Sequence, residues 1–252
     1  GVRHYKPGEI LSTKHYSKVE DALVIFQGDP LLFEPGTRYS YTTYGYNVLG
    51  AVVARASGQR FVDYLEKNVF EPANMTNAQA DDSFRIIKHR AQGYRKNALG
   101  ALCNSAMVDT SNKTPGGGLS STAADLVEFA HALMAGKLVK PETVRQMWTQ
   151  VTDKDGKPVP GRNGRPARYG LGFSLMSRQG PRSVGHGGAQ PRVRTLLVIR
   201  PDEGVVVSLM SNLEGSRLNG IARDLGKHVV ETLGARKSAM EAAKKKARND
   251  GK

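Results

Sequence analysis

The stretch SVGHGGAQPRVR, residues 183–194, contains residue types that could form one wall of a catalytic cleft. His186 is followed directly by Gly187 and Gly188, where a run of apolar segments begins that predicts strands. Glycine weakens a strand, so a pair of glycines usually marks a bulge or a place where another group approaches the backbone closely. Two interpretations follow. The pair forms a turn, or it leaves backbone N–H groups open to a substrate beside an imidazole.

Serine hydroxyls are the candidate nucleophiles, and Ser120 and Ser121 in GGGLSSTAADL are the most conspicuous of them. Both precede a predicted helix, where hydroxyl side chains commonly cap the first backbone N–H groups, so we interpret them as caps. No serine in the 252 residues is followed three positions later by lysine, and no Gly-x-Ser-x-Gly motif is present. The sequence therefore contains no motif for an activated serine.

Tyr41 lies in a segment that also contains Tyr39, Tyr44 and Tyr46. A tyrosine near the start of a helix more often packs against the core than takes part in catalysis. A strand histidine such as His186 is likewise more often a hydrogen-bonded structural residue. From the residue types alone, both side chains are therefore expected to be structural.

Hydrophobic periodicity and turn residues define the elements that must position these side chains. A short helix is predicted in VEDALVIFQG, and apolar residues at Val48, Leu49, Val52, Val53 and Ala56 predict a helix ended by Gly58. A second helix carries Phe61, Tyr64, Leu65 and Val69 and ends at Pro72, whereas residues 73–118 show little periodicity and predict an irregular lobe. A helix is also predicted in LSSTAADLVEFAHALMAGK, with Ser121 or Thr122 as its cap and Gly136 as its end, and Pro141 opens another short helix.

The second half of the chain predicts strands in YGLGFSLM, SVGH, RTLLVIR and GVVVSLMS, the last two joined as an antiparallel hairpin by PDEG. A closing helix, RLNGIARDLGKHVVETLG, places six apolar residues on one face: Leu218, Ile221, Ala222, Leu225, Val229 and Leu233. Strands grouped together, with helices before and after them, predict an α+β fold.

Composition limits the class of protein further. A chain of 252 residues with 39% hydrophobic content can bury one substantial core. The single cysteine, Cys103, excludes an internal disulfide, and no Cys/His spacing resembles a zinc site, so we expect no metal and no cofactor. No apolar run reaches the length of a membrane span, and the chain starts without a signal segment.

The formal charge of +14 raises the question of nucleic-acid binding. Residues 236–252 contain seven Lys/Arg and two Asp/Glu and so contribute +5 of that charge, and the remainder is scattered. No basic motif is interleaved with aromatic residues that could stack on bases, so we do not expect a nucleic-acid partner. We predict that residues 235–252 form a basic tail that is disordered or a detached, fraying helix.

Three segments in this order resemble the serine β-lactamase-like family, which includes class C β-lactamases, D-Ala-D-Ala carboxypeptidases, esterases and D-aminopeptidases. They are EPGTRYSYTTYGYNVLGAVV, GGGLSSTAADLVEF and GHGGAQPRVRTLLVIRPDEGVVVSLMSN. The opening GVRHY also resembles a segment of the mitochondrial branch of the family and its bacterial relatives. The resemblance implies a β-lactamase/transpeptidase-like fold over residues 1–234, with an antiparallel sheet flanked by helices and a helical or irregular lobe.

Catalysis in that family rests on a Ser-x-x-Lys, a Tyr-x-Asn and a Lys-Thr-Gly or His-x-Gly. The resemblance places Tyr41 at the tyrosine of the second motif, as the catalytic base or its relay, and His186, Gly187 and Gly188 at the third. The N–H of Ala189 would then be one of two oxyanion-hole donors. Since Ser-x-x-Lys is absent, the resemblance implies that the nucleophile helix precedes this chain, and we expect these 252 residues alone to be inactive.

Two departures from the family pattern concern the substrate. Thr43 stands where the family has asparagine, and His186 and Gly187 replace a lysine and a threonine that could hold a substrate carboxylate. Arg192 or Arg194 could supply a charge, but an ester or peptide substrate without an essential carboxylate fits better.

The function predicted from the sequence is therefore that of a serine hydrolase, a peptidase or esterase, acting through an acyl-enzyme. The alternative is a non-catalytic binding or assembly domain of the same family. The resemblance predicts a periplasmic or secreted location if the protein is bacterial and a mitochondrial one if it is eukaryotic, and it leaves the oligomeric state open.

Overall fold

The computed structural model describes residues 1–161, 163–177 and 182–250, without the side chains of 237–250. Its helices are α1 Thr43–Ser57, α2 Phe61–Leu65, α3 Thr114–Gly117, α4 Ala123–Met134, α5 Pro141–Met147 and α6 Leu218–Asp250. Shorter helical segments are the 3-10 helices η1 Glu9–Leu11, η2 Glu20–Ile25 and η4 Ser111–Lys113 and the π-helix η3 Glu66–Phe70. Its strands are β1 Gln79–Ala80, β2 Tyr94–Lys96, β3 Leu102–Asn104, β4 Leu119–Ser120, β5 Ser174–Leu175, β6 Val184–Gln190, β7 Val193–Arg200 and β8 Val205–Ser211.

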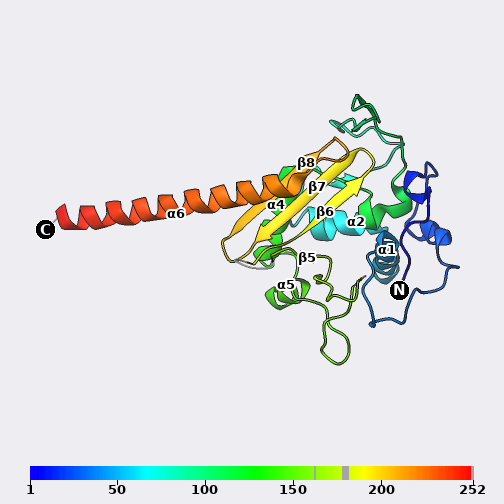
Figure 1. Ribbon diagram of the computed structural model, residues 1–252, viewed down its shortest axis with the longest axis horizontal. Helices are drawn as coiled ribbons and strands as arrows, with labels where there is room; N and C mark the ends of the chain where they lie inside the picture. The colour runs from blue at the N-terminus through cyan, green and yellow to red at the C-terminus, as the bar shows by residue number, and fades with distance from the viewer. Residues whose placement is uncertain (162, 178–181, 251–252) are drawn as a thin grey trace.

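The main sheet is antiparallel, in the order β5-β6-β7-β8 (Figure 1). The predicted hairpin between β7 and β8 and the α+β class are confirmed. The strand predicted in YGLGFSLM is wrong in extent, because only Ser174 and Leu175 pair with β6. Of the rest of that segment, Tyr169 forms an isolated bridge to Ser174.

Alternate residues of β7 face the two helices that cover the sheet, as the two-residue period of a strand requires. Leu197 and Ile199 join the core that contains Ala130 and Leu133 of α4. Leu196 lies on the opposite face, in a smaller cluster with Ala222 of α6. The sheet is thus held between α4 and α6, and this fixes where β6 lies.

Helix α1 begins at its cap Thr42, whose Oγ1 accepts the Gly45 N–H at 3.1 Å, and ends at Gly58 with φ 68°. Its buried face is not the apolar one that predicted the helix, because Leu49 and Val52 are both more than half exposed. The buried residues are Thr43, Tyr44, Asn47, Gly50 and Ala54. Helix α1 therefore buries Tyr44 together with small and polar residues, and it leaves an apolar side exposed.

The single apolar face predicted for α6 is divided in the structure. Leu218 and Ala222 pack on the sheet, whereas Ile221 is 52% exposed and Leu225 is 42% exposed. Val229 and Leu233 continue this exposed side. Figure 1 shows α6 leaving the sheet as one long helix. No helix within the described residues combines the length and the apolar character needed to cross a membrane.

Candidate active site

Tyr41 and His186 lie together, although 145 positions separate them in the sequence. Their ring centroids are 6.0 Å apart and the rings are inclined by 28°. Tyr41 immediately precedes the cap of α1 and is 45% exposed, and His186 lies on β6. The start of α1 and the strand β6 thus bring the two predicted site residues to one place.

Hydrogen bonds determine the proton position on His186. Its Nδ1 lies 2.8 Å from the carbonyl oxygen of Gly187, which can only accept, so Nδ1 carries the hydrogen and donates. The other ring nitrogen, Nε2, lies 2.9 Å from the Tyr169 hydroxyl and accepts from it in the neutral ring. Burial lowers the pKa of His186, which also favours the neutral form. His186 is therefore held in place with both nitrogens engaged.

Tyr169 belongs to this site but was not found from the sequence. Besides its hydrogen bond to His186, its ring packs against Tyr39 with centroids 5.2 Å apart. Burial raises the pKa of Tyr169, so its phenol keeps the proton that it donates to His186. The segment around Tyr169 resembles an ordinary strand, so no pattern in it indicates this role.

The glycines beside His186 lie within β6 and not in a turn. Every residue from Val184 to Gln190 pairs one to one with β7, so the strand contains no bulge. On its other side, β6 is paired with β5 at Val184 and Gly185, and among the described residues the pairing goes no further along β6. The strand beyond Gly185 therefore has an edge that β5 leaves uncovered.

Strand geometry indicates which backbone groups face that edge. The Met176 N–H donates to the carbonyl of Ser183 at 2.9 Å, so the backbone groups of Ser183 point toward β5. Backbone groups of successive residues alternate between the two sides of a strand. Gly187 and Ala189 are even numbers of residues from Ser183, so their N–H groups point to the uncovered edge.

Tyr41 is a neutral phenol in this environment. Burial raises its pKa, the neighbouring Tyr46 adds to the effect, and the Thr43 hydroxyl opposes it. No cation of the described residues is among these causes. A tyrosine acts as a base only when a nearby positive charge lowers its pKa. Such a charge would have to come from elsewhere.

A hydrogen bond links β6 to α3, which packs against the start of α1. The Gln190 Nε2 donates to the carbonyl oxygen of Gly117 at 2.6 Å, which joins the end of β6 to α3. A Cβ on Gly116 would overlap the Thr43 side chain, so α3 in turn lies directly against the start of α1. The separation between Tyr41 and His186 is therefore set through α3.

The serines near α4 have structural roles that differ partly from the predicted ones. Thr122 is the cap of α4, with its Oγ1 accepting the Asp125 N–H at 3.1 Å. Ser121 supports the first turn by donating to Asp125 Oδ2 at 3.0 Å. The interpretation of Ser120 as a cap is wrong, because it lies in β4 with its Oγ buried.

Lys113 is another titratable residue that the sequence did not point to. It is fully buried, and its Nζ donates to the carbonyl of Ile10 at 3.2 Å and lies 5.5 Å from the centre of the Tyr5 ring. Burial lowers its pKa to about 8. This ammonium is thus held in the interior by carbonyl and aromatic contacts.

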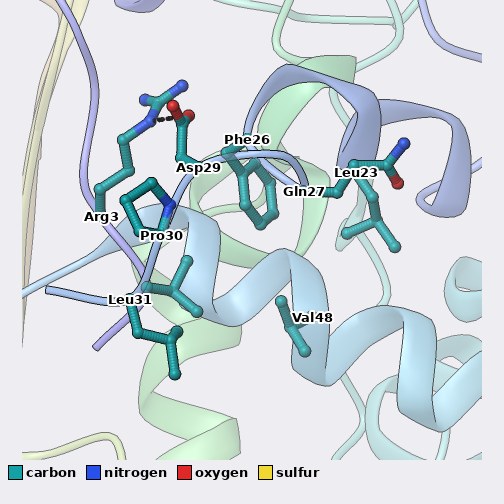
Figure 2. Close-up of a pocket in the computed structure, with 9 residues that line it drawn as sticks. Arg3, Leu23, Phe26, Gln27, Asp29, Pro30, Leu31 and Val48 are labelled. Carbon is teal, nitrogen blue, oxygen red and sulfur yellow. Dashed lines mark hydrogen bonds and ion pairs between the residues drawn. The ribbon is translucent and has the colours of Figure 1, made fainter. Parts of the chain in front are cut away.

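Two cavities occur elsewhere around α1. Figure 2 shows a pocket of about 190 Å³, in which Phe26, Leu31 and Val48 lie beside the ion pair of Arg3 and Asp29. A groove of about 610 Å³ runs along the opposite end of α1 and carries charges of both signs. Neither cavity includes Tyr41 or His186. Within the described residues, no group of three His, Cys, Asp or Glu side chains could hold a metal ion.

The antiparallel sheet held between helices is a β-lactamase/transpeptidase-like fold. The chain belongs to the beta-lactamase family, whose model matches residues 1–231. It is 30% identical over 254 aligned positions to the human mitochondrial serine beta-lactamase-like protein LACTB, in an alignment covering 86% of this chain and 45% of that protein.

Solved structures share the fold. A penicillin-binding protein from Bacillus halodurans has a TM-score of 0.68 at 24% identity and covers 90% of this chain. A D-amino acid amidase from Ochrobactrum anthropi has a TM-score of 0.71 at 20% identity and covers 95% of it. The matches extend over 66% and 69% of those two chains. The chain thus spans less than half of its human relative and about two thirds of these structures.

Proposed function

We propose that this chain is part of a serine hydrolase that cleaves amide or ester bonds through an acyl-enzyme. The serine and lysine of a Ser-x-x-Lys motif would be supplied by a segment outside the 252 residues. The observation that carries the proposal is the position of Tyr41 against His186, beside the uncovered edge of β6 where the Gly187 and Ala189 N–H groups point. The family membership and the greater length of its relatives support it.

In this proposal each residue has a separate task. Tyr41 relays the proton of the serine hydroxyl, first away from the nucleophile and then to the leaving group. Its raised pKa requires a cation nearby for that task, and the motif lysine would provide it. The Ala189 N–H stabilises the oxyanion. His186, with both nitrogens engaged, shapes and polarises the cleft without moving the proton.

The substrate we propose is an amide or ester that needs no free carboxylate. Arg194, which could have bound one, instead donates from Nη1 to the carbonyls of Gln190 and Val193, each at 2.8 Å. The structural neighbour from Ochrobactrum anthropi is a D-amino acid amidase, which also supports an amide substrate. The compartment would be mitochondrial in a eukaryote and periplasmic or extracellular in a bacterium.

Labelling with a fluorophosphonate probe tests the proposal. The full-length protein should be labelled on the serine of an upstream Ser-x-x-Lys, and the 252-residue chain alone should not react. Labelling of an internal serine such as Ser120 would overturn the site assignment. A full-length protein that lacks the motif and does not react would instead identify a non-catalytic binding or assembly domain.

A further inference from the structure

The N-terminal residues are hydrogen-bonded to the start of α1, next to Tyr41. The Thr42 hydroxyl donates to the carbonyl of Arg3 at 2.6 Å, and the Thr43 N–H donates to Nδ1 of His4 at 3.1 Å. The first backbone N–H groups of a helix have no partner within the helix. His4 therefore satisfies one of them with its side chain, 39 positions away in the sequence.

The hydrogen bond from Thr43 determines the state of the His4 ring. Because Nδ1 accepts, the proton of the neutral imidazole is on Nε2. Burial lowers the pKa of His4, and the positive end of the α1 dipole also disfavours an imidazolium there. The ring meets Tyr41 edge to face, with centroids 5.5 Å apart at 81°, and lies 4.2 Å from the Tyr5 ring. His4 thus contacts both the helix start and the Tyr41 ring.

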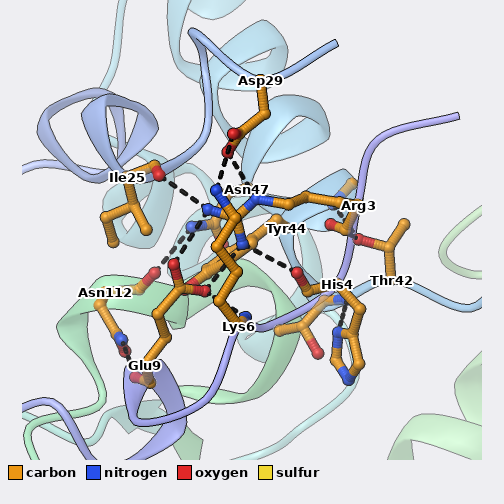
Figure 3. Close-up of polar contacts among 12 residues, drawn as sticks. Arg3, His4, Lys6, Glu9, Ile25, Asp29, Thr42, Tyr44, Asn47 and Asn112 are labelled. Atoms are coloured by element: carbon orange, nitrogen blue, oxygen red, sulfur yellow. Dashed lines mark hydrogen bonds and ion pairs between the residues drawn. The ribbon is translucent and has the colours of Figure 1, made fainter. Parts of the chain in front are cut away.

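Arg3 anchors this segment from the other side (Figure 3). Its guanidinium makes a bidentate pair with Glu9 at 2.8 and 2.9 Å, and its Nε donates to Asp29 at 2.5 Å. Arg3 is 9% exposed, and the two carboxylates raise its pKa, so it remains charged. Because these ion pairs hold Arg3 in place, the adjacent His4 is kept in position to accept the Thr43 N–H.

We propose that His4 is a positioning residue of the active site. It fixes the start of α1 through the Thr43 N–H, and it thereby holds Tyr41 against His186. The proposal rests on the proposed role of Tyr41 and adds a residue that acts through it. The essential property of His4 is the acceptor at the Nδ1 position and not the bulk of its ring.

Two substitutions in the 252-residue chain distinguish the effect of the His4 hydrogen-bond acceptor from the effect of the bulk of its ring. His4→Asn keeps an acceptor close to the Nδ1 position and loses the ring, and His4→Phe keeps the ring and loses the acceptor. Amide hydrogen exchange at Thr43 reports how well its N–H, at the first turn of α1, is protected by this hydrogen bond. Tyr41 is followed by fluorine NMR of 3-fluorotyrosine, with Tyr41→Phe assigning its signal. Nitrogen NMR of the unsubstituted chain determines the His4 tautomer without any variant.

We expect an unprotonated Nδ1 in the unsubstituted chain. His4→Phe should speed Thr43 exchange by about 2- to 12-fold, corresponding to one lost hydrogen bond, and should move the Tyr41 signal and lower its pKa. His4→Asn should leave Thr43 exchange and the Tyr41 pKa close to the unsubstituted values, and should move the Tyr41 signal only by the small amount that loss of the neighbouring His4 ring causes. A protonated Nδ1, or a Tyr41 signal that moves in His4→Asn but not in His4→Phe, would overturn the proposal. So would a Tyr41 signal that neither variant moves.

Turnover by the full-length protein separates this inference from the proposed function. If Tyr41 is catalytic, His4→Phe should reduce kcat by more than His4→Asn does, with a smaller change in KM. If the variants move Tyr41 as expected but leave turnover unchanged, the role of Tyr41 fails, whereas the placement of Tyr41 by His4 is upheld.

Discussion

Alanine substitution at two glycines of β6 tests the strand geometry on which the site depends. A Cβ on Gly185, which is buried, would overlap the carbonyl oxygen of Leu197 on β7 and lie 3.0 Å from Met176 Cε. The backbone of a central strand cannot move aside cheaply, so Gly185→Ala should behave as an overpacking substitution. Such substitutions cost about 1–3 kcal/mol in the free energy of unfolding.

Gly187→Ala is the matched control, two residues along the same strand. Gly187 is exposed, and its Cβ would have as its closest neighbours atoms of Thr195 and Leu196 at 3.7 and 3.8 Å, which is ordinary contact. Its unfolding free energy should change by no more than about 0.5 kcal/mol.

Thermal unfolding of the two variants in one buffer gives the comparison. For a chain of this size, 1 kcal/mol corresponds to about 2–4 °C in Tm, so Gly185→Ala should melt ~2–12 °C lower and Gly187→Ala within about 2 °C of the unsubstituted chain. Equal melting temperatures for the two variants would show that Gly185 does not lie against β7 as described. The register that places the Ala189 N–H at the uncovered edge would then be wrong too.

In the full-length protein, Tyr41→Phe should leave Tm nearly unchanged, because the ring contacts remain, and should reduce turnover by ~100- to 10,000-fold; turnover within about threefold of the unsubstituted enzyme would remove Tyr41 from the mechanism. The Lys113 pKa of about 8 lies below its unfolded value of 10.5, so between these two pH values the unfolded state holds the extra proton and stability should rise with pH, by ~3 kcal/mol in all. Urea unfolding from pH 7 to 10.5 should show this rise in the unsubstituted chain but not in Lys113→Met. Protease cleavage near Arg236 should leave the melting transition unchanged, and a large loss of stability would contradict a detached segment at 236–252.

Helix α1 shows what periodicity can and cannot predict. The spacing of its apolar residues correctly indicated a helix ended by Gly58, yet Leu49 and Val52 are exposed. The buried side is chosen by close approach to α3, where a Cβ on Gly50 would overlap Pro115. Periodicity reports which residues share a side of a helix, but contacts with distant segments decide which side is buried.

The residues of the candidate site likewise include some that a sequence pattern can reveal and some that it cannot. The glycine motif beside His186 could be found because it is contiguous in the sequence and its residue types are unusual in a strand. Tyr169 and His4 could not, since each is linked to a predicted site residue by one hydrogen bond, over 17 and 39 positions of the sequence. A single tyrosine or histidine has no pattern of neighbours that predicts such a contact.

The hydrogen bond between Gln190 and Gly117 has a consequence for how the range of substrates could evolve. It connects β6, through α3, to the start of α1, so the distance between these two elements depends on residues that need not touch a substrate. If Tyr41 and His186 act as proposed, selection for bulkier substrates would act on Gln190 and leave the proposed proton transfer at Tyr41 unchanged. A library randomised at Gln190 should yield variants with altered size preference, whereas one randomised at Tyr41 should yield mainly inactive proteins.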